Sequence, residues 1–401
     1  MTTTNKHFCP IPFHHLALRP NGKVYPCCFF RWDETPDDFN LNHPDLFHHP
    51  FLEKIRNEIR EDKPVAGCQG CYRNEENSGQ SMRTKYISDS SLGFSTTAPE
   101  TPTLTYLDLA LSNVCNNKCR MCSHELSTNW YPDTKKLIDM GFFLDTEMPK
   151  GLINNSKFDI FETYDFSKLT FIKLIGGEPL MEQQKFINVL KKCNLAGLKL
   201  LITTNGTLLP NDELLSLLKQ CKKISWNISI DSYGPINDFL RKGSKWEETK
   251  SNLDWYIKTF PKKVNVHSVI SVYNINNFYE LNEYLTETYG TEVVTHGVVA
   301  ADGPGWIMAS NLPTSVKEKV KKKLLDYNEI KKINNLELAL SAVDRPAEGH
   351  DKGTYLKDFI HLDTLLNQIR AEHWKDVNPE LWEWLKDIYE GHIKWVPPAD
   401  R

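Results

Sequence analysis

The chain has 401 residues, of which 40% are hydrophobic and 25% are charged, and these proportions are typical of a globular protein. Its 48 Lys and Arg residues against 52 Asp and Glu residues give a net charge of -4, so the charge balance speaks against nucleic acid as an electrostatically captured partner. No apolar run approaches the ~18 residues that span a bilayer, and the N-terminus (MTTTNKHFCPIPFHH) lacks the regions of a signal peptide. We therefore expect a cytoplasmic protein without a membrane partner.

The cysteines are concentrated near the N-terminus. Eight of the ten precede residue 123: Cys9, Cys27, Cys28, Cys68, Cys71, Cys115, Cys119 and Cys122. In a reducing compartment, close cysteine pairs favour metal or redox work over disulfides. The remaining two, Cys193 and Cys221, end apolar helical stretches and are expected to be buried structural thiols.

Composition divides the chain into four parts. Residues 1–86 are rich in Cys, His, Pro and aromatics and have few long periodic stretches, and residues 87–103 are a linker dominated by Ser, Thr and Pro. Strands and helices are predicted to alternate over residues 104–303, and a helical extension is predicted over residues 304–401.

The N-terminal part contains two cysteine groups. Asn21-Gly22 marks a tight hairpin turn between β-like runs, which brings Cys9 near Cys27 and Cys28. Cys68-x2-Cys71 supplies a second pair, and four thiolates from the two regions make a closed tetrathiolate site. Iron–sulfur and zinc both satisfy this coordination.

The third part has the pattern of a parallel α/β sheet. Six short β-rich runs are predicted strands: Leu104–Leu111, Thr170–Ile175, Lys199–Thr204, Ile224–Ile230, Val264–Val272 and Val293–Val299. Four amphipathic stretches are predicted helices between them: Met181–Cys193, Asp212–Cys221, Trp246–Phe260 and Asn277–Tyr289. Six such strands suit an open or partial barrel whose active site lies at the carboxyl ends of the strands.

Two longer regions complete the outline. The stretch Ser123–Phe166 separates the first two strands by more than a normal connection, so we expect an insertion or lid that carries its own helix. Helices are predicted in the extension over Thr314–Ile333, Tyr355–Trp374 and Glu380–Ile393, and the lysines of the first are expected to form a solvated face.

Three cysteines follow the first predicted strand in the spacing C-x3-C-x2-C, at Cys115, Cys119 and Cys122. Three thiolates within eight residues can hold one corner of an iron–sulfur cube, which normally takes four cysteines, and would leave one iron with an open site. A zinc site that borrows a distant fourth ligand is the alternative, although zinc sites favour paired C-x2-C spacings.

At these residues the sequence resembles the radical S-adenosylmethionine (radical SAM) superfamily over roughly residues 104–303. The resemblance implies that Cys115, Cys119 and Cys122 hold a [4Fe–4S] cluster whose open iron chelates the amino and carboxylate groups of SAM. It further implies reductive cleavage of SAM to a 5′-deoxyadenosyl radical, which abstracts a hydrogen from a substrate.

Further positions match the superfamily in the expected order. Gly176, Gly177, Glu178 and Pro179 follow the second predicted strand, where glycines allow close backbone approach and a carboxylate can accept from the SAM ammonium. The resemblance assigns ribose, carboxylate and adenine contacts to six more residues: Thr204, Asn205, Ser229, Asp231, Arg241 and Met121. Of these, Arg241 suits the carboxylate because a guanidinium binds it bidentately, and simple packing is the alternative for Met121.

The N-terminal part resembles the SPASM/twitch auxiliary-cluster module of radical SAM enzymes. Its P-x-G-x-V-x-P-C hairpin appears here as Pro20 to Cys27 and is followed by the Cys68-x2-Cys71 pair. The resemblance implies that Cys9, Cys27, Cys68 and Cys71 hold an auxiliary [4Fe–4S] cluster; Cys28 in place of Cys27, and zinc in place of iron–sulfur, remain alternatives. Such modules usually follow the barrel, and this one precedes it.

The resulting hypothesis is a radical SAM enzyme with an auxiliary cluster that assists electron transfer or substrate binding. The reaction would end as oxidation, epimerisation, cross-linking or rearrangement of a peptide, sugar or nucleoside-type substrate, with a reductant such as flavodoxin or ferredoxin. No residue is predicted as a catalytic acid or base, because the cofactor performs the hydrogen abstraction. The alternative is a zinc-bearing binding module on a catalytically inert α/β domain.

Overall fold

The computed structural model describes residues 5–20, 22–89, 93–142, 165–301, 305–345 and 352–392. They form two compact units. The first contains residues 1–114, 151–203 and 210–225, and the second contains residues 115–150, 204–209 and 226–401. Asn21 of the expected turn and residues 143–164 of the expected insertion lie outside the described residues.

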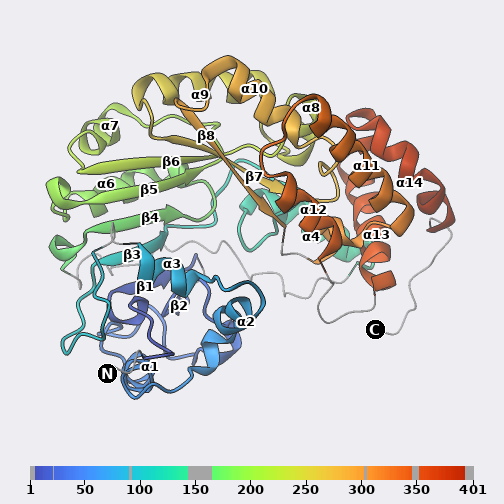
Figure 1. The fold of residues 1–401 in the computed structure, drawn as a ribbon. Coiled ribbons are helices and arrows are strands. Elements are labelled where there is room, and N and C mark those ends of the chain that lie inside the picture. Colours follow the sequence, from blue (N-terminus) through green and yellow to red (C-terminus); the bar gives the residue numbers. More distant parts are fainter. Residues whose placement is uncertain are drawn as a thin grey trace. The chain divides into compact units, whose positions relative to one another are not determined.

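The first unit is built on a sheet that includes the N-terminal hairpin (Figure 1). Strands β3 (Tyr106–Ala110), β4 (Phe171–Ile175) and β5 (Lys199–Thr204) are parallel neighbours. Strand β1 (His15–Leu18) pairs parallel with β3, and β2 (Val24–Tyr25) pairs antiparallel with β1. The N-terminal module therefore docks on the first strand of the predicted barrel by extending its sheet.

Three short helices surround this hairpin: α1 (Pro50–Arg60), α2 (Gln69–Ser78) and α3 (Met82–Ser88). A proline at the first position of α1, and a Ser81–Thr84 capping box at α3, explain where these two begin. The composition of residues 1–86 predicted few long periodic stretches, and the helices are short: the turn at Cys68 separates α1 from α2, and Gly79 with φ +71° ends α2 before α3.

Strands β4 and β5 have one covered face and one partly open face, whereas β1 and β3 are buried along their whole length. In β4, Ile172 and Leu174 are fully buried, while Lys173 between them is half-buried. Helices α6 (Gln183–Leu190) and α7 (Asp212–Leu218) follow β4 and β5 in the chain and supply buried leucines, isoleucine and phenylalanine. Successive side chains of a strand point to opposite faces, so Asp108 and Ala110 of β3 share one face.

The second unit contains the rest of the alternating pattern. Strands β6 (Lys223–Ser229, of which the last four residues belong here), β7 (Val264–Ile270) and β8 (Val294–Ala300) pair parallel in that order. Three helices follow the strands of this unit: α8 (Pro235–Leu240), α9 (Trp246–Thr259) and α10 (Tyr279–Tyr289). The α/β class is as predicted, and the parallel strands with their helices are consistent with a partial (β/α)6 barrel.

The C-terminal extension is helical, as expected, and belongs to the second unit. Its helices lie together in Figure 1: α11 (Thr314–Ile330), α12 (Leu336–Asp344), α13 (Lys352–Arg370) and α14 (Pro379–His392). Helix α13 packs on α4 (Tyr131–Asp139) through buried leucines that include Leu137 and Leu366. Within the described residues, no helix is long and apolar enough to cross a bilayer.

Candidate functional site

The cluster loop, residues 115–122, carries the C-x3-C-x2-C cysteines. Cys115 and Cys119 are buried, Cys122 is half-buried, and none of the three forms a disulfide. The backbone N–H of Asn117 points at the sulfur of Cys115 at 3.4 Å, and the Ser127 hydroxyl donates to the Asn117 carbonyl at 2.5 Å. The loop is thus turned tightly around its first cysteine.

Hydrogen-bond donors face two of the three sulfurs. Asn205 Nδ2 lies 4.0 Å from the sulfur of Cys115, and Arg241 Nη1 lies 3.9 Å from the sulfur of Cys119. Donors at cysteine sulfurs are a regular feature of iron–sulfur sites, so the residues present fit a cluster. Burial raises the pKa of the Cys119 and Cys122 thiols, so a metal must displace their protons when it binds.

The cluster loop also contacts residues 240–243, the segment that carries Arg241. Backbone N–H groups of Lys118 and Arg120 donate to the carbonyls of Lys242 and Leu240, at 2.7 and 2.8 Å. Gly243 has φ +112°, and a Cβ there would lie 2.6 Å from the Asn116 carbonyl oxygen. Only glycine permits this backbone approach, which holds Arg241 beside the cluster loop.

Asp231 forms an ion pair with Arg241. The carboxylate is fully buried, forms an ion pair with Arg241 Nε at 2.8 Å and accepts from the Val269 backbone N–H at 2.9 Å. Burial would lower the pKa of Arg241, but Asp231 and Cys119 hold it above its ordinary value. Both oxygens of Asp231 therefore face groups of the protein, and its predicted contact with ribose remains a prediction.

The other residues of the second unit that are predicted to contact SAM differ in their burial and in their hydrogen bonds. Asn205 donates to Asn116 Oδ1 at 2.8 Å and so lies against the cluster loop. Thr204 is buried, and its hydroxyl accepts from the Gly206 N–H at 3.2 Å within the turn. Ser229 is half-buried at the end of β6, and Met121 is half-buried and packs on the apolar core of the unit.

The Gly176–Pro179 turn belongs to the first unit and lies against the residues that lead into the cluster loop. The N–H groups of Gly177 and Glu178 donate to the carbonyls of Ser112 and Val114, at 2.9 and 2.7 Å. Glu178 is almost fully buried, and its carboxylate accepts from the Leu180 N–H at 3.0 Å, which caps the turn after it. The contact of this carboxylate with the ammonium of SAM remains a prediction.

Four N-terminal cysteines lie in one neighbourhood. The thiol of Cys27 interacts electrostatically with Cys9 and Cys68, and Cys9 interacts with Cys71. Burial raises the pKa of Cys9 to about 12 and that of Cys27 well above its ordinary value. Within the described part of the chain, no three His, Cys, Asp or Glu side chains converge as they do around one bound ion.

Cys28 lies in different surroundings from Cys27. Burial raises the pKa of Cys28, and the charged groups that act on it are Asp108, Lys173 and Arg19, with a side-chain contact to Tyr86. The thiols that act on Cys27 are those of Cys28, Cys68 and Cys9. Cys27 as the fourth ligand of an auxiliary site, with Cys28 as its alternative, remains a prediction.

Two family models match the chain. The model of the radical SAM superfamily matches residues 109–285, and that of the SPASM iron–sulfur cluster-binding domain matches residues 9–72. The chain therefore contains a radical SAM domain and, N-terminal to it, a SPASM domain. The first domain implies a [4Fe–4S] cluster and SAM, and the second implies auxiliary iron–sulfur.

Two curated relatives match part of the chain. The mitochondrial GTP 3′,8-cyclase of Arabidopsis thaliana is 28% identical over 168 residues, which are 41% of this chain and 39% of the relative. The S-adenosylmethionine-dependent nucleotide dehydratase of Flammeovirga pacifica is 26% identical over 186 residues, 43% of this chain and 55% of the relative. The chain thus spans about half the length of these relatives or less.

Solved structures show lower similarity. Native anSMEcpe with bound AdoMet is 18% identical, with a TM-score of 0.39 over 56% of this chain and 59% of that chain. Streptococcus suis SuiB is 17% identical, with a TM-score of 0.34 over 57% of this chain and 47% of that chain. The assignment of the radical SAM domain rests on the family models.

Replacement of Gly177 with alanine tests the backbone contact of the Gly176–Pro179 turn. The new Cβ would lie 2.3 Å from the Val114 carbonyl oxygen, so the backbone must shift. We expect a normal iron content, because every cysteine is retained, but a large loss of SAM affinity in equilibrium dialysis. Gly197→Ala is the matched control, since its Cβ meets only the Asn194 side chain at 3.5 Å, and equal losses in both variants would refute the assignment.

A second pair of variants separates the two adjacent cysteines of the SPASM domain. Cys27→Ala is expected to lower the iron content by about four per chain, the content of one [4Fe–4S] cluster, whereas Cys28→Ala keeps it. Iron and sulfide analysis of anaerobically purified protein measures this difference. Loss of iron from Cys28→Ala alone would reverse the ligand assignment.

A buried acid beside Cys28 was not predicted from the sequence. Asp108 of β3 is fully buried, with His15 Nε2 at 3.6 Å and Lys173 Nζ at 3.8 Å. Burial by itself would raise the pKa of Asp108, but His15 and Lys173 outweigh burial and hold it at about 2. The available signal was an aspartate in the middle of the apolar run LTYLDLAL, and the acid helps to attach β1 to β3 and β4.

Proposed function

We propose that the protein is an enzyme that reductively cleaves SAM to methionine and a 5′-deoxyadenosyl radical, which abstracts a hydrogen from a substrate. The observation that carries the proposal is the cluster loop: three disulfide-free cysteines follow strand β3 in a region that matches the radical SAM superfamily. Three cysteine ligands leave one of the four irons open for a co-substrate.

In the proposal, different residues of the chain bind the cluster and the separate parts of SAM. Cys115, Cys119 and Cys122 hold the cluster. Glu178 accepts from the ammonium of SAM, and Arg241, which Asp231 holds in place, donates to the carboxylate. Among the remaining predicted contacts, Asn205 and Ser229 would bind the ribose, Thr204 would support the turn that carries Asn205, and Met121 would pack on the adenine.

The SPASM domain contributes an auxiliary [4Fe–4S] cluster, held by Cys9, Cys27, Cys68 and Cys71 in the proposal. The sheet pairing of β1 with β3 supports a role beside the substrate, because it attaches the module to the first strand of the radical SAM domain. The auxiliary cluster would take an electron from the substrate or bind the substrate directly.

The substrate is a peptide, a sugar or a nucleoside-type molecule in this proposal. The names of the curated relatives refer to GTP and to a nucleotide, and other solved relatives are described with bound peptides. A low-potential reductant such as flavodoxin or ferredoxin would supply the electron in the cytoplasm. The zinc-bearing inert module is disfavoured by the match to both iron–sulfur family models.

Anaerobic incubation with SAM and dithionite tests the proposed function. We expect equal amounts of methionine and 5′-deoxyadenosine, together with about eight irons per chain for two [4Fe–4S] clusters. Stoichiometric zinc without iron, and no 5′-deoxyadenosine, would refute the proposal. A content near four irons would remove only the auxiliary cluster.

A further inference from the structure

Helix α13 of the C-terminal extension presents polar side chains to the interior. Asp363, Asn367 and Arg370 are spaced i, i+4 and i+7, so they share one helix face, and all three are buried. Buried polar groups need partners. Theirs lie between 237 and 247 residues earlier in the chain, in and just after the cluster loop.

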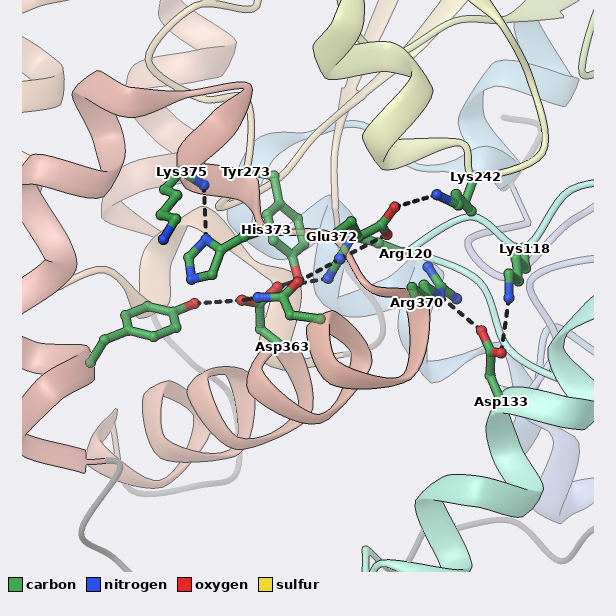
Figure 2. Close-up of polar contacts among 12 residues, drawn as sticks. Lys118, Arg120, Asp133, Lys242, Tyr273, Asp363, Arg370, Glu372, His373 and Lys375 are labelled. Carbon is green, nitrogen blue, oxygen red and sulfur yellow. Dashed lines mark hydrogen bonds and ion pairs between the residues drawn. The ribbon is translucent and has the colours of Figure 1, made fainter.

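Arg120 is the centre of this contact and lies between two predicted cluster ligands. Its guanidinium is fully buried and donates to Asp363 Oδ1 at 2.7 Å, Asn367 Oδ1 at 2.7 Å and Glu372 Oε1 at 3.0 Å (Figure 2). Its central carbon lies 3.8 Å from the ring centroid of Phe239. We call Arg120, Asp363, Asn367 and Glu372 the Arg120 clamp.

Asp363, which accepts a hydrogen bond from Arg120, also accepts hydrogen bonds from other buried side chains. Besides Arg120, Asp363 accepts from the hydroxyl of Tyr273 at 2.8 Å, the hydroxyl of Tyr389 at 3.1 Å and the amide of Asn367 at 2.9 Å. Four side chains therefore hold the Asp363 carboxylate, and Arg120 is one of them.

The C-terminal extension also forms ion pairs with residues near Arg120 in the chain and in space. Glu372 accepts from Lys242 at 2.6 Å, and Lys242 is adjacent in the chain to Arg241 (Figure 2). Arg370 donates to Asp133 at 2.8 Å, and Asp133 accepts from Lys118 of the cluster loop at 2.9 Å. Both basic side chains of the cluster loop are thus tied to the extension.

We propose that Arg120 is a positioning residue, which through Asp363, Asn367 and Glu372 fixes the spacing between the cluster loop and the Arg241 segment that SAM binding requires. The C-terminal extension is then a working part of the SAM site. A buried ion network contributes little net stability compared with apolar packing, but it selects one arrangement. The inference rests on the proposed function.

The double variant Arg120→Met/Asp363→Asn tests this role, because it removes both charges and leaves no unpaired ion in the interior. We expect a thermal unfolding midpoint close to that of the wild type. SAM affinity in anaerobic equilibrium dialysis should fall about tenfold, and amide exchange of residues 116–122 should accelerate about tenfold. Arg345→Met, at an exposed arginine of the same extension, is the matched control and should change neither.

Glu372→Gln is a milder second variant at the rim of the clamp, where loss of folding is not expected. It removes the charge that links Arg120 to Lys242, so SAM affinity should fall in the same direction by a smaller factor. Unchanged SAM affinity and unchanged loop exchange in both variants would overturn the inference. The exchange measurement on the purified protein does not depend on SAM cleavage, so it tests the clamp even if the wild type fails to cleave SAM.

Discussion

Replacement of Cys119 with alanine is expected to abolish 5′-deoxyadenosine formation. Cys119 is the middle cysteine of the cluster loop, is buried, and lies beside Arg241 Nη1. With two cysteines left, the loop cannot hold the cluster with one open iron, so about four irons per chain are lost and reductive cleavage ends. Cys115→Ala and Cys122→Ala should behave alike. Anaerobic iron analysis and quantification of 5′-deoxyadenosine measure both effects.

Cys193→Ala provides the control for general damage by cysteine removal. Cys193 follows helix α6, and its thiol donates to the carbonyl of Val189 at 3.4 Å, which is the environment of a structural thiol. We expect this variant to keep its iron and its activity. Retained SAM cleavage in Cys119→Ala would contradict the assignment of the cluster ligands.

The second large effect is expected from Cys68→Ala in the SPASM domain. Burial raises the pKa of the Cys68 thiol, and its neighbours include Cys9 and Cys71. Loss of this ligand should lower the iron content from about eight to about four per chain, because only the cluster of the radical SAM domain remains. Some SAM cleavage should survive, since that cluster is untouched, but turnover of the true substrate should stop.

Iron analysis and the yield of 5′-deoxyadenosine in the same preparation separate these outcomes for Cys68→Ala. An unchanged iron content would show that Cys68 is not a ligand. Full turnover of the true substrate, once it is identified, would reduce the N-terminal site to a structural role. Zinc in the wild-type SPASM domain would instead support the zinc site, which was the alternative to iron–sulfur in the sequence analysis.

The strands were predictable because burial on one face leaves an alternating pattern. The predicted run Lys199–Thr204 coincides with β5, and the other five differ from the observed strands by at most two residues at either end. Helices α8 and α12 were not predicted. The helices of the N-terminal module were also missed, although the buried Leu52, Ile55 and Ile59 of α1 recur at helical spacing.

The candidate site was predictable only where its residues are close in sequence. The spacing of Cys115, Cys119 and Cys122 identified the cluster loop without any structure. The partners of Arg120 were out of reach, because Asp363 lies 243 residues away and nothing local in the sequence links the two. The choice between the adjacent Cys27 and Cys28 was also out of reach, because which thiol lies near Cys9 depends on packing that the sequence does not reveal.

The most direct test of the central claim, a three-cysteine cluster with an open iron that binds SAM, is a spectrum. In Cys68→Ala/Cys71→Ala only the cluster of the radical SAM domain should remain. The electron paramagnetic resonance spectrum of the dithionite-reduced variant should then change when SAM is added, since SAM binds the open iron directly. A normal iron–sulfur signal that SAM leaves unaltered would contradict the account.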